Sequence, residues 1–347
     1  MSFRRWIPQF HSGPGWTGPA GDHFDGRTFF NPGHRGPLGF RELLRWRLTG
    51  SPAVWPKHVD DVRRADFPER SGGGELAITV VGHATFLIQI NGVNLLTDPV
   101  WSERVSPFSW IGPRRVRKPG IPWERLPRID AVLISHSHFD HLDLATLRAL
   151  HGRFDPAFIT GLGNGGLLAS RGMTRCTELD WWQATAVAEG ALRVTFVPAR
   201  HWSNRGDGRL NTTLWGGFVI EGGGRSAYFA GDSGWFAGFA MIRERCGAPD
   251  IALLPIGAYE PRWFMSVMHV NPEEALRAMR EINARYAVAM HWGTFRHTDE
   301  LLDEPLRKLA AALENAGVAP QRFFVMQHGE TRKLDFLMNA TEDDATR

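Results

Sequence analysis

The sequence SHSHFDHLD at residues 135–143 directly follows an apolar run at 129–134 that is typical of a buried strand. It holds three histidines and an aspartate within six positions, which packing alone does not explain. Imidazole and carboxylate groups hold zinc and its first-row neighbours in proteins. In extended backbone the side chains at i and i+2 lie on one side, so His136 and His138 can bind one ion. Asp140 and His141 follow on the turn and are expected to face a second ion. The stretch therefore predicts a metal site.

Three further residues of ligand type repeat this pattern later in the chain. His201 follows an apolar run at 194–200, Asp232 follows one at 227–231, and His291 follows one at 287–290. Open sheets place their functional sites at the carboxyl ends of strands. A lone histidine is more often a structural residue than a ligand, but the recurrence of the pattern predicts that these residues join the same site.

Composition restricts the class of protein. The chain has 347 residues, enough for one large or two ordinary domains, with 43% hydrophobic and 22% charged residues and a net charge of +3. This charge alone does not indicate a nucleic-acid partner. The two cysteines form no CxxC pattern, which excludes a disulfide framework and a thiolate zinc site and fits a reducing, cytoplasmic location. No apolar run approaches the roughly 20 residues that span a bilayer, and residues 1–10 show no secretory signal.

The first part of the chain differs in pattern from the rest. Residues 1–35 are rich in Gly, Pro, His and Arg without periodicity and predict an irregular arm. Phe40, Leu43, Leu44 and Leu48 then form an apolar stripe that predicts a short amphipathic helix at 40–48. Such a stripe either packs on the protein or, beside its arginines and Trp46, lies on a membrane surface.

From residue 76 the pattern predicts many short strands and a few helices. Strands are expected at 76–81, 85–90, 93–97, 129–134, 157–160, 192–198, 214–220, 226–230, 251–255, 287–290 and 323–327, and helices at 144–150, 272–285 and 301–316. Runs of strands followed by helices indicate an α+β protein with layered helix–sheet–sheet–helix packing. We expect an arm and short helix at 1–75, a catalytic domain at 76–335, and a frayed acidic tail at 336–347.

A long loop is expected at residues 101–123. It carries four aromatic residues among five basic ones. Loops of this length inside compact domains are usually functional or disordered. This one either forms the wall of a groove for an anionic, apolar substrate or is a surface flap.

The order HxHxDH, His, Asp, His resembles the metallo-β-lactamase superfamily, which implies a four-layer αβ/βα sandwich. Further motifs are similar to those of the N-acylphosphatidylethanolamine-hydrolysing phospholipase D family, over about residues 76–334. They are GHAT at 82–85, LTDP at 96–99, ELDWW at 178–182, AGDSG at 230–234, PIGAYEPRWFM at 255–265, HWGTF at 291–295 and HGE at 328–330. The long stretch at 255–265 is the one that indicates this branch.

The resemblance implies a centre of two Zn²⁺ ions, with iron or manganese also suited to the ligand types. One ion would be held by His136, His138 and His201, the other by Asp140, His141 and His291, with Asp232 bridging them. The implied reaction is attack of a metal-bound hydroxide on the phosphodiester of an N-acylphosphatidylethanolamine, which gives phosphatidic acid and an N-acylethanolamine.

The resemblance also assigns roles outside the ligand set. Asp140 and His269 would be catalytic, and Phe139 and His269 would contact substrate. Phe139 departs from the tyrosine of the animal enzymes, which removes a hydroxyl at the substrate; the alternative for His269 is a helix-capping or buried polar role. His83, Asp98 and His328 would orient ligand imidazoles by hydrogen bonds, or serve the fold alone.

Other functions fit the same residues. A metal-dependent lactonase of the related sugar-lactone branch would use the same centre on another bond. RNA cleavage would use the loop at 101–123 as a basic platform, but no RNA-binding module is visible. A scaffold without activity is disfavoured because every implied ligand is present. We therefore expect a phospholipid substrate, peripheral contact with a membrane surface and no nucleic acid, while a homodimer is left open.

Overall fold

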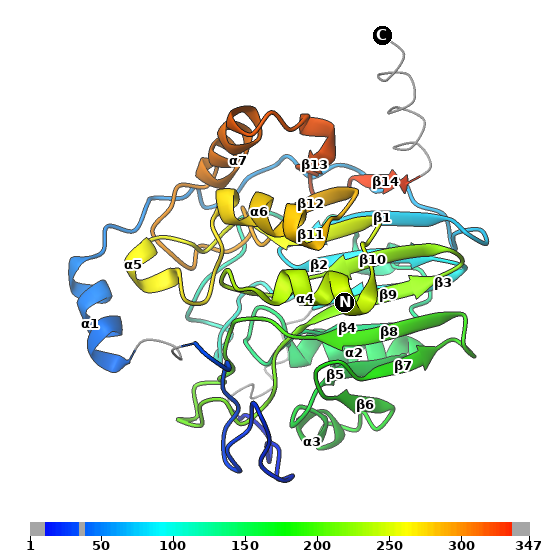
Figure 1. Cartoon of the computed structure of the whole chain (residues 1–347), viewed down its shortest axis with the longest axis horizontal. Coiled ribbons are helices and arrows are strands. Elements are labelled where there is room, and N and C mark those ends of the chain that lie inside the picture. The colour runs from blue at the N-terminus through cyan, green and yellow to red at the C-terminus, as the bar shows by residue number, and fades with distance from the viewer. Residues whose placement is uncertain (1–10, 35–38, 335–347) are drawn as a thin grey trace.

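The computed structural model describes residues 11–34 and 39–334, whose strands form two seven-stranded sheets (Figure 1). The first sheet has the order β14 (Thr331–Lys333), β1 (Leu76–Gly82), β2 (Thr85–Ile90), β3 (Val93–Thr97), β4 (Ala131–Ile134), β5 (Ala157–Gly161) and β6 (Cys176–Leu179). The second has the order β13 (Phe323–Phe324), β12 (Tyr286–Met290), β11 (Ile251–Pro255), β10 (Arg225–Phe229), β9 (Gly217–Gly222), β8 (Leu192–Val197) and β7 (Ala184–Val187).

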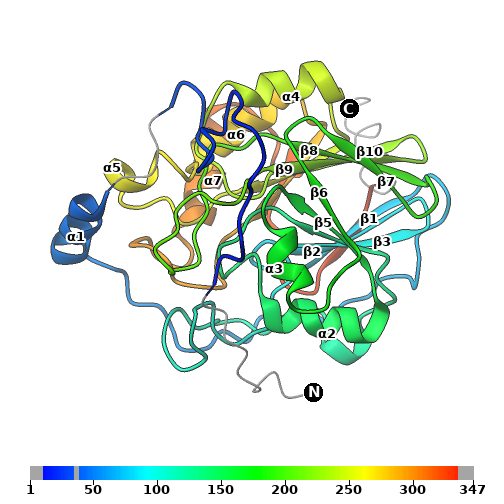
Figure 2. The same cartoon turned by 90° about the horizontal axis from the view of Figure 1, so that it is seen from below.

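α-Helices accompany both sheets. They are α1 (Phe40–Thr49), α2 (Leu144–Phe154), α3 (Gly165–Ala169), α4 (Gly238–Cys246), α5 (Arg262–Met265), α6 (Pro272–Ile282) and α7 (Glu304–Asn315), with 3₁₀ turns η1 (Trp123–Arg125) and η2 (Pro320–Arg322). Figure 2 shows α2 and α3 on one side of the paired sheets and α4, α6 and α7 on the other. The predicted four-layer αβ/βα sandwich is confirmed.

The two sheets have matching connectivity. In each, antiparallel strands are followed along the sheet by parallel ones: β3–β4–β5–β6 are parallel in the first sheet and β10–β11–β12–β13 in the second. At one edge the sheets are joined by backbone hydrogen bonds, from Gly216 N–H to Ser135 O (3.1 Å) and from His291 N–H to His83 O (3.0 Å). The carboxyl ends of β4, β10 and β12 therefore meet at this edge.

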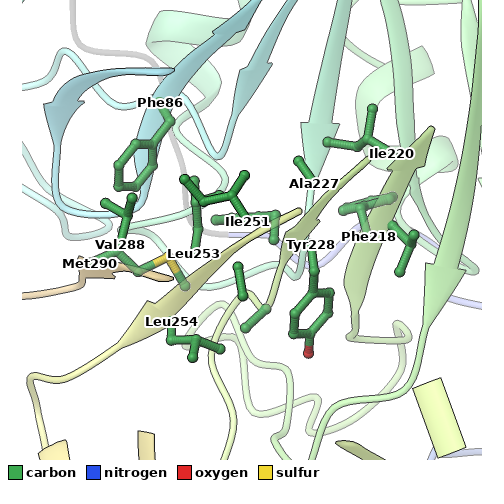
Figure 3. Packing of buried hydrophobic residues seen from close by; sticks show 14 of the residues in the cluster. Phe86, Phe218, Ile220, Ala227, Tyr228, Ile251, Leu253, Leu254, Val288 and Met290 are labelled. Carbon is green, nitrogen blue, oxygen red and sulfur yellow. The ribbon is translucent and has the colours of Figure 1, made fainter. Parts of the chain in front are cut away.

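Side-chain alternation divides the core into layers. Along β2, Phe86 and Ile88 belong to the cluster between the sheets, which also contains Val288 of β12, while Leu87 belongs to the cluster under α2 (Figure 3). Successive side chains on a strand point to opposite faces, so a strand buried on both sides is apolar throughout. Every residue of β1 to β4 is accordingly buried, and these strands are mostly apolar.

Helix α1 forms where it was predicted but buries a different face. Phe40 and Leu48 of the predicted stripe are 76% and 75% exposed, whereas Trp46 is 8% exposed and stacks on Phe264 of α5 at 5.2 Å. The expectation that the stripe packs on the protein is wrong. The large indole is buried instead because its ring meets an apolar surface and its Nε1–H donates to Asp299 (3.0 Å).

Residues 12–31 lack helices and long strands, as expected for an arm, but they pack against the sheets. Phe24 and Phe29 are buried in the cluster between the sheets, and Asn31 is 7% exposed. The division of the chain at residues 75 and 335 stays a prediction, and the tail at 336–347 lies outside the described residues.

Several element boundaries differ from the prediction for local reasons. β9 starts at Gly217 and not at Leu214, because Leu214 and Gly216 donate their N–H groups to the first half of the chain. α6 stops at Ile282, because Asn283 adopts a left-handed conformation with φ of 56°. The strand predicted at 323–327 pairs over two residues only.

Some short elements were not predicted at all. They are β6, β7, β14, α3, α4 and α5, none of which exceeds nine residues. In the part of the chain that the structure describes, no helix combines the length and apolar character needed to cross a bilayer.

Candidate metal centre

The seven residues predicted as ligands come together at the edge where the sheets meet. His136, His138, Asp140 and His141 lie on the turn between β4 and α2. His201 follows β8, Asp232 follows β10 and His291 follows β12. The side chains that follow β8, β10 and β12 therefore lie beside the turn after β4, as predicted.

Three imidazoles form the first group, which we call the imidazole group: His136, His138 and His201. His138 Nδ1 lies 2.9 Å from His136 Nε2 and 3.2 Å from His201 Nε2. Three nitrogen atoms thus point at one position.

Asp140, His141 and His291 form the second group, which we call the carboxylate group. The Nε2 atoms of the two histidines are 3.3 Å apart, and they lie 3.4 Å and 3.6 Å from Asp140 Oδ2.

Asp232 lies between the two groups. Its Oδ2 is 3.2 Å from Nε2 of both His141 and His291, 3.8 Å from His201 Nε2 and 4.0 Å from His136 Nε2. Its Oδ1 is buried and has no hydrogen-bond partner among the described residues. One carboxylate oxygen is therefore shared by both groups.

Hydrogen bonds at the outer nitrogens orient the rings. His141 Nδ1–H donates to Asp98 Oδ2 (2.6 Å), and His201 Nδ1–H donates to Met268 O (3.0 Å). Ser135 Oγ–H donates to Asp98 Oδ2 (2.6 Å), so its oxygen accepts from His136 Nδ1–H (2.8 Å). These bonds turn each Nε2 toward the centre, as second-layer partners of metal-bound histidines do.

The backbone around the centre is tightly constrained. His83, Asp98 and His291 have φ of 58°, 33° and 62°, a region that side-chain-bearing residues rarely adopt and that is common at functional sites. Gly231, with φ of 60°, has no room for a Cβ, which would lie 2.7 Å from Ser135 Cβ. The close approach of the two sheets before Asp232 therefore requires glycine at this position.

The two groups differ in electrostatics in the metal-free protein. Burial, together with neighbouring imidazoles, lowers the pKa of His138 to about 3, and burial lowers the pKa of His201 to about 4. Burial also opposes the charged form of His141 and His291, but Asp232 and Asp140 outweigh it. They raise the pKa of His291 to about 9 and that of His141 well above its usual value.

Both carboxylates of the centre are ionised. Burial raises the pKa of Asp140 and Asp232, but the charges of the surrounding histidines, His141 first, hold both pKa values well below the usual range. The centre therefore combines three neutral imidazoles with two carboxylates and two cationic imidazoles.

Of the three residues predicted to orient the ligands, two contact the centre directly and one does not. His83 Nε2 is 3.0 Å from Asp140 Oδ2, and Asp98 contacts His141 as described. His328 contacts none of the seven among the described residues: it bonds Lys118 O and Thr294 Oγ1, and Thr294 in turn accepts from His83 N–H.

The two residues predicted to contact substrate border the centre. His269 is 9% exposed, and its Nδ1 lies 3.9 Å from Asp232 Oδ2 without a hydrogen-bond partner in the described structure. It does not cap α6, because Asn271 does. The half-buried Phe139 ring packs against Val100, Val105 and Phe295.

Two residues of the site were missed from the sequence. His297 Nε2 lies 3.3 Å from Asp140 Oδ2 and has no hydrogen-bond partner among the described residues. Arg205 is fully buried, donates to Ser137 O (2.7 Å) and Leu142 O (3.0 Å), and lies over the ring of Phe139. It therefore fixes the turn that carries four of the seven residues.

The donor set fits metal ions. Zn–N bonds of about 2.0–2.1 Å in tetrahedral geometry place two ligand nitrogens about 3.3 Å apart, close to the 3.2 Å and 3.3 Å measured in the two groups. The unpartnered oxygen of Asp232 is a second indication, because a buried carboxylate oxygen is rarely left without a partner. The His and Asp residues here form four overlapping sets, and within each set the donor atoms lie within 4.8 Å of one another.

A groove of about 660 Å³ adjoins the centre. Its walls are residues 46–57, 104–116 and 296–299, and we call it the basic groove because five of its lining residues are Lys or Arg. His297 belongs both to this lining and to the surroundings of Asp140. The loop at 101–123 thus forms a groove wall, while its Trp101 and Trp123 are buried.

Comparisons with known proteins agree with this fold and centre. The family model described as "Beta-lactamase superfamily domain" matches residues 93–292. An uncharacterised protein of Mycobacterium tuberculosis is 44% identical over 250 residues, which are 71% of this chain and 66% of that protein. The chain thus spans just under two thirds of the length of that relative.

A relative with a named activity is also found. N-acyl-phosphatidylethanolamine-hydrolyzing phospholipase D 1 of Caenorhabditis elegans is 36% identical over 266 residues, 74% of each chain. Among solved structures, Igni18, a metallo hydrolase from Ignicoccus hospitalis, matches with a TM-score of 0.56 and 24% identity over 75% of this chain and 98% of that one, which shows the fold alone. Family, relatives and donor set together support a metal-dependent hydrolase.

Proposed function

The chain belongs to the metallo-β-lactamase superfamily, and we propose that it is a dinuclear zinc phosphodiesterase. Its substrates would be N-acylphosphatidylethanolamine-type phospholipids, which it would hydrolyse to phosphatidic acid and an N-acylethanolamine. The observation that carries the proposal is the convergence of two donor groups on the shared Oδ2 of Asp232. The 36% identity to the C. elegans phospholipase D supports the substrate.

The proposed ligand sets follow the two groups. His136, His138 and His201 would hold one ion; Asp140, His141 and His291 would hold the other; and Asp232 would serve both. Imidazole and carboxylate donors suit zinc, and also iron or manganese. Such ions supply, when bound, activated water at neutral pH and charge neutralisation at a phosphoryl oxygen.

The chain's own residues would bind and orient the phosphodiester. Burial lowers the pKa of His269 well below its usual value, so its imidazole is neutral at pH 7 and Nδ1 is open to a substrate oxygen. We assign it the contact with the leaving oxygen. Phe139 would contribute an apolar face without a hydroxyl, and Asp98 would hold the ring of His141 in place.

Peripheral contact with a lipid surface is part of the proposal. Two of the three segments that wall the basic groove project apolar side chains into solvent. In α1 these are Phe40 and Leu48, and in the loop they are Trp110 and Ile111, which are 71% and 51% exposed. Apolar residues on both sides of a basic groove favour contact with the surface of anionic membranes. Failure to float with anionic vesicles in a density gradient would contradict this part.

Assay of the purified protein on a panel of N-acylphosphatidylethanolamine and sugar lactones tests the function. We expect release of N-acylethanolamine, and loss of about a thousandfold or more of kcat/KM in Asp232→Asn, because several kcal/mol of transition-state stabilisation would be lost. The exposed Asp66, changed to Asn, is the matched control and is expected to behave as wild type. Hydrolysis of lactones but not of the phospholipid would identify the lactonase alternative, and an active Asp232→Asn would overturn the mechanism.

A further inference from the structure

The basic groove has a strong excess of positive charge. Its lining includes Arg47, Lys57, Arg104, Arg114 and Arg296, against the single acidic residue Asp299. A concave surface lined by one sign of charge concentrates ligands of the opposite sign. The groove is therefore suited to an anion.

Most of this charge is not neutralised by the protein. Arg114 pairs with Glu103, and Asp299 accepts a hydrogen bond from Trp46 Nε1–H. The other four basic side chains have no acidic partner within ion-pair distance in the described parts of the chain. Arg104 and Arg296 donate to the backbone oxygens of Gly112 and Ala53. Donation to a carbonyl positions a guanidinium but leaves its charge available.

The same lining has an apolar component. Trp46 and Trp55 line the groove, and both indole N–H groups are occupied, by Asp299 and by the carbonyl oxygen of Glu300. The half-buried Trp55 ring adds apolar surface to the lining, whereas Trp46 is buried, with Phe264 stacked on its ring and Arg47 lying over it. An anion joined to an apolar stem matches this lining better than a free inorganic ion, which would use only the basic side chains.

One side chain separates the groove from the metal centre. His297 lines the groove, and its Nε2 lies 3.3 Å from Asp140 Oδ2. A ligand in the groove is therefore one residue away from the carboxylate group. The proposed phosphodiester carries one negative charge, and the centre itself would receive it. The basic residues of the groove remain for another anionic group.

We propose that the basic groove binds a second anionic group, carried on the head group of the substrate. The preferred substrates would be N-acylated phospholipids whose head group bears a carboxylate or phosphate beyond the phosphorus that reacts. The head group is the part of a phospholipid that can leave the lipid surface and enter a solvent-facing groove. This inference rests on the proposed phosphodiesterase function.

A matched pair of substrates tests the specificity. N-acylphosphatidylserine and N-acylphosphatidylethanolamine differ by one carboxylate on the head group, and both can be presented in the same micelles of non-ionic detergent. We expect kcat/KM to be about tenfold higher for the serine lipid, the effect of one charge-assisted hydrogen bond. The preference should weaken as salt is added.

The groove variant for this test is Arg47→Gln with Lys57→Gln. Both side chains are exposed and donate no hydrogen bond to the described protein, so the fold is expected to persist. The preference for the serine lipid should disappear, and this ratio does not depend on the amount of folded enzyme. The control is Arg148→Gln with Arg243→Gln, which removes the same charge from exposed positions outside the groove and should keep the ratio.

A binding measurement separates this inference from the proposed function. Titration calorimetry with N-lauroylserine and N-lauroylethanolamine requires no turnover. If the serine compound binds more tightly and the groove variant loses this difference, anion binding by the groove is supported. This holds even if neither phospholipid is hydrolysed. If both lipids are hydrolysed at equal rates and both amides bind equally, the groove does not bind a second anionic group. The proposed function would be unaffected by this result.

Two further outcomes would also overturn the inference. Equal loss of the preference in the control variant would show a non-specific effect of surface charge. Binding of a short single-stranded RNA that depends on Arg47 and Lys57, without binding of N-lauroylserine, would assign the groove to nucleic acid instead.

Discussion

The imidazole group and the carboxylate group use the same residue types in opposite electrostatic states. In the metal-free protein the imidazole group is neutral, because burial and mutual proximity lower the pKa values of His138 and His201. In the carboxylate group, Asp140 and Asp232 keep His141 and His291 protonated. The imidazole group is thus buried as uncharged rings. The carboxylate group is buried as paired charges, cationic imidazoles beside carboxylates. The difference teaches that the same residue types can contribute to the fold through opposite charge states.

The largest expected effect compares one donor from each group. His138→Ala and Asp140→Ala should each lower kcat/KM about a thousandfold and reduce the bound metal by about one equivalent, because each removes a donor. In the metal-free state they should differ. Asp140→Ala leaves two buried cationic imidazoles with less compensation and should destabilise the fold, whereas His138→Ala removes a crowded neutral ring.

Metal content by elemental analysis and chemical unfolding of the metal-free proteins provide the measurements. His58→Ala, an exposed histidine, is the control for both variants. Equal destabilisation of the two metal-free variants would refute the proposed electrostatic difference between the groups.

The next prediction compares the residues that orient one histidine in each group, Asp98 for His141 and Ser135 for His136. Asp98 is fully buried and receives hydrogen bonds from Ser135 N–H, Ser135 Oγ–H and His141 Nδ1–H. Asp98→Asn should lower metal affinity about 10- to 100-fold, as loss of such orienting partners does. Ser135→Ala removes the oxygen that accepts from His136 and should have a smaller effect. Competition with a fluorescent zinc chelator measures both, and a larger effect of Ser135→Ala would contradict this order.

The third effect is the pH dependence of metal-free stability. The pKa of His291 is about 9 when folded and about 6.5 when unfolded, so its stabilising effect is complete below pH 6.5 and is lost as the pH rises through 9. The pKa of His138 is about 3 when folded, so its effect has the opposite sign: stability is present above pH 6.5 and is lost as the pH falls toward 3. At about 1.36 kcal/mol for each pKa unit, these changes should amount to about 3 kcal/mol for His291 and about 5 kcal/mol for His138.

Urea unfolding of the metal-free protein at several pH values measures these slopes. His291→Asn should flatten the alkaline side of the stability curve and leave the acid side. His138→Asn should flatten the acid side and leave the alkaline side. If both variants flatten the same side, the two groups do not have the opposite charge states described above.

The smallest expected effect concerns Asn31, which contacts a residue of the imidazole group. Asn31 Nδ2–H donates to His201 O (2.8 Å), and its Oδ1 accepts from Trp215 Nε1–H (3.2 Å). Asn31→Ala should lower the free energy of unfolding by about 1 kcal/mol, because His201 O loses its donor, while Trp215 Nε1–H keeps its bond to Ala199 O (3.0 Å). It should also weaken the binding of one metal equivalent only. Calorimetric zinc titration distinguishes this from an equal loss at both groups, which would contradict the assignment of Asn31 to His201.

Much of the fold and of the centre could be predicted because both rest on local pattern. Strands buried on both faces give continuous apolar runs, and a lone His or Asp after such a run lies at the sheet edge. His201, Asp232 and His291 were found in this way, and the structure brings them to the β4 turn.

The residues that support the centre from elsewhere in the fold left no such pattern. Asn31 stands in a segment without periodicity, and Arg205 is a single arginine four positions after His201. Their roles depend on contacts across 170 and 68 positions of sequence. His297 lies only six positions after His291, and this spacing was the one signal that could have found it.

The sequence left two alternatives for the stripe of α1, and the one in which it packs on the protein is contradicted, for a different reason. The stripe at Phe40, Leu43, Leu44 and Leu48 satisfies helical periodicity, but burial is decided by what lies opposite. Phe264 and Asp299, which receive the ring and the N–H of Trp46, are more than 200 positions away. Periodicity locates the helix, and only tertiary contacts select its buried side.

The packing of residues 12–31 against later segments restricts the order in which the protein can complete its fold during synthesis. Asn31 must wait for His201 and Trp215, which follow 170 and 184 positions later, and Ser12 must wait for Asp207. At about 5–20 residues per second, this delay lasts about 10 to 40 seconds. Phe24 and Phe29 stay without their final partners throughout this interval. Residues 12–31 therefore reach their final packing only after the chain has been made as far as Trp215.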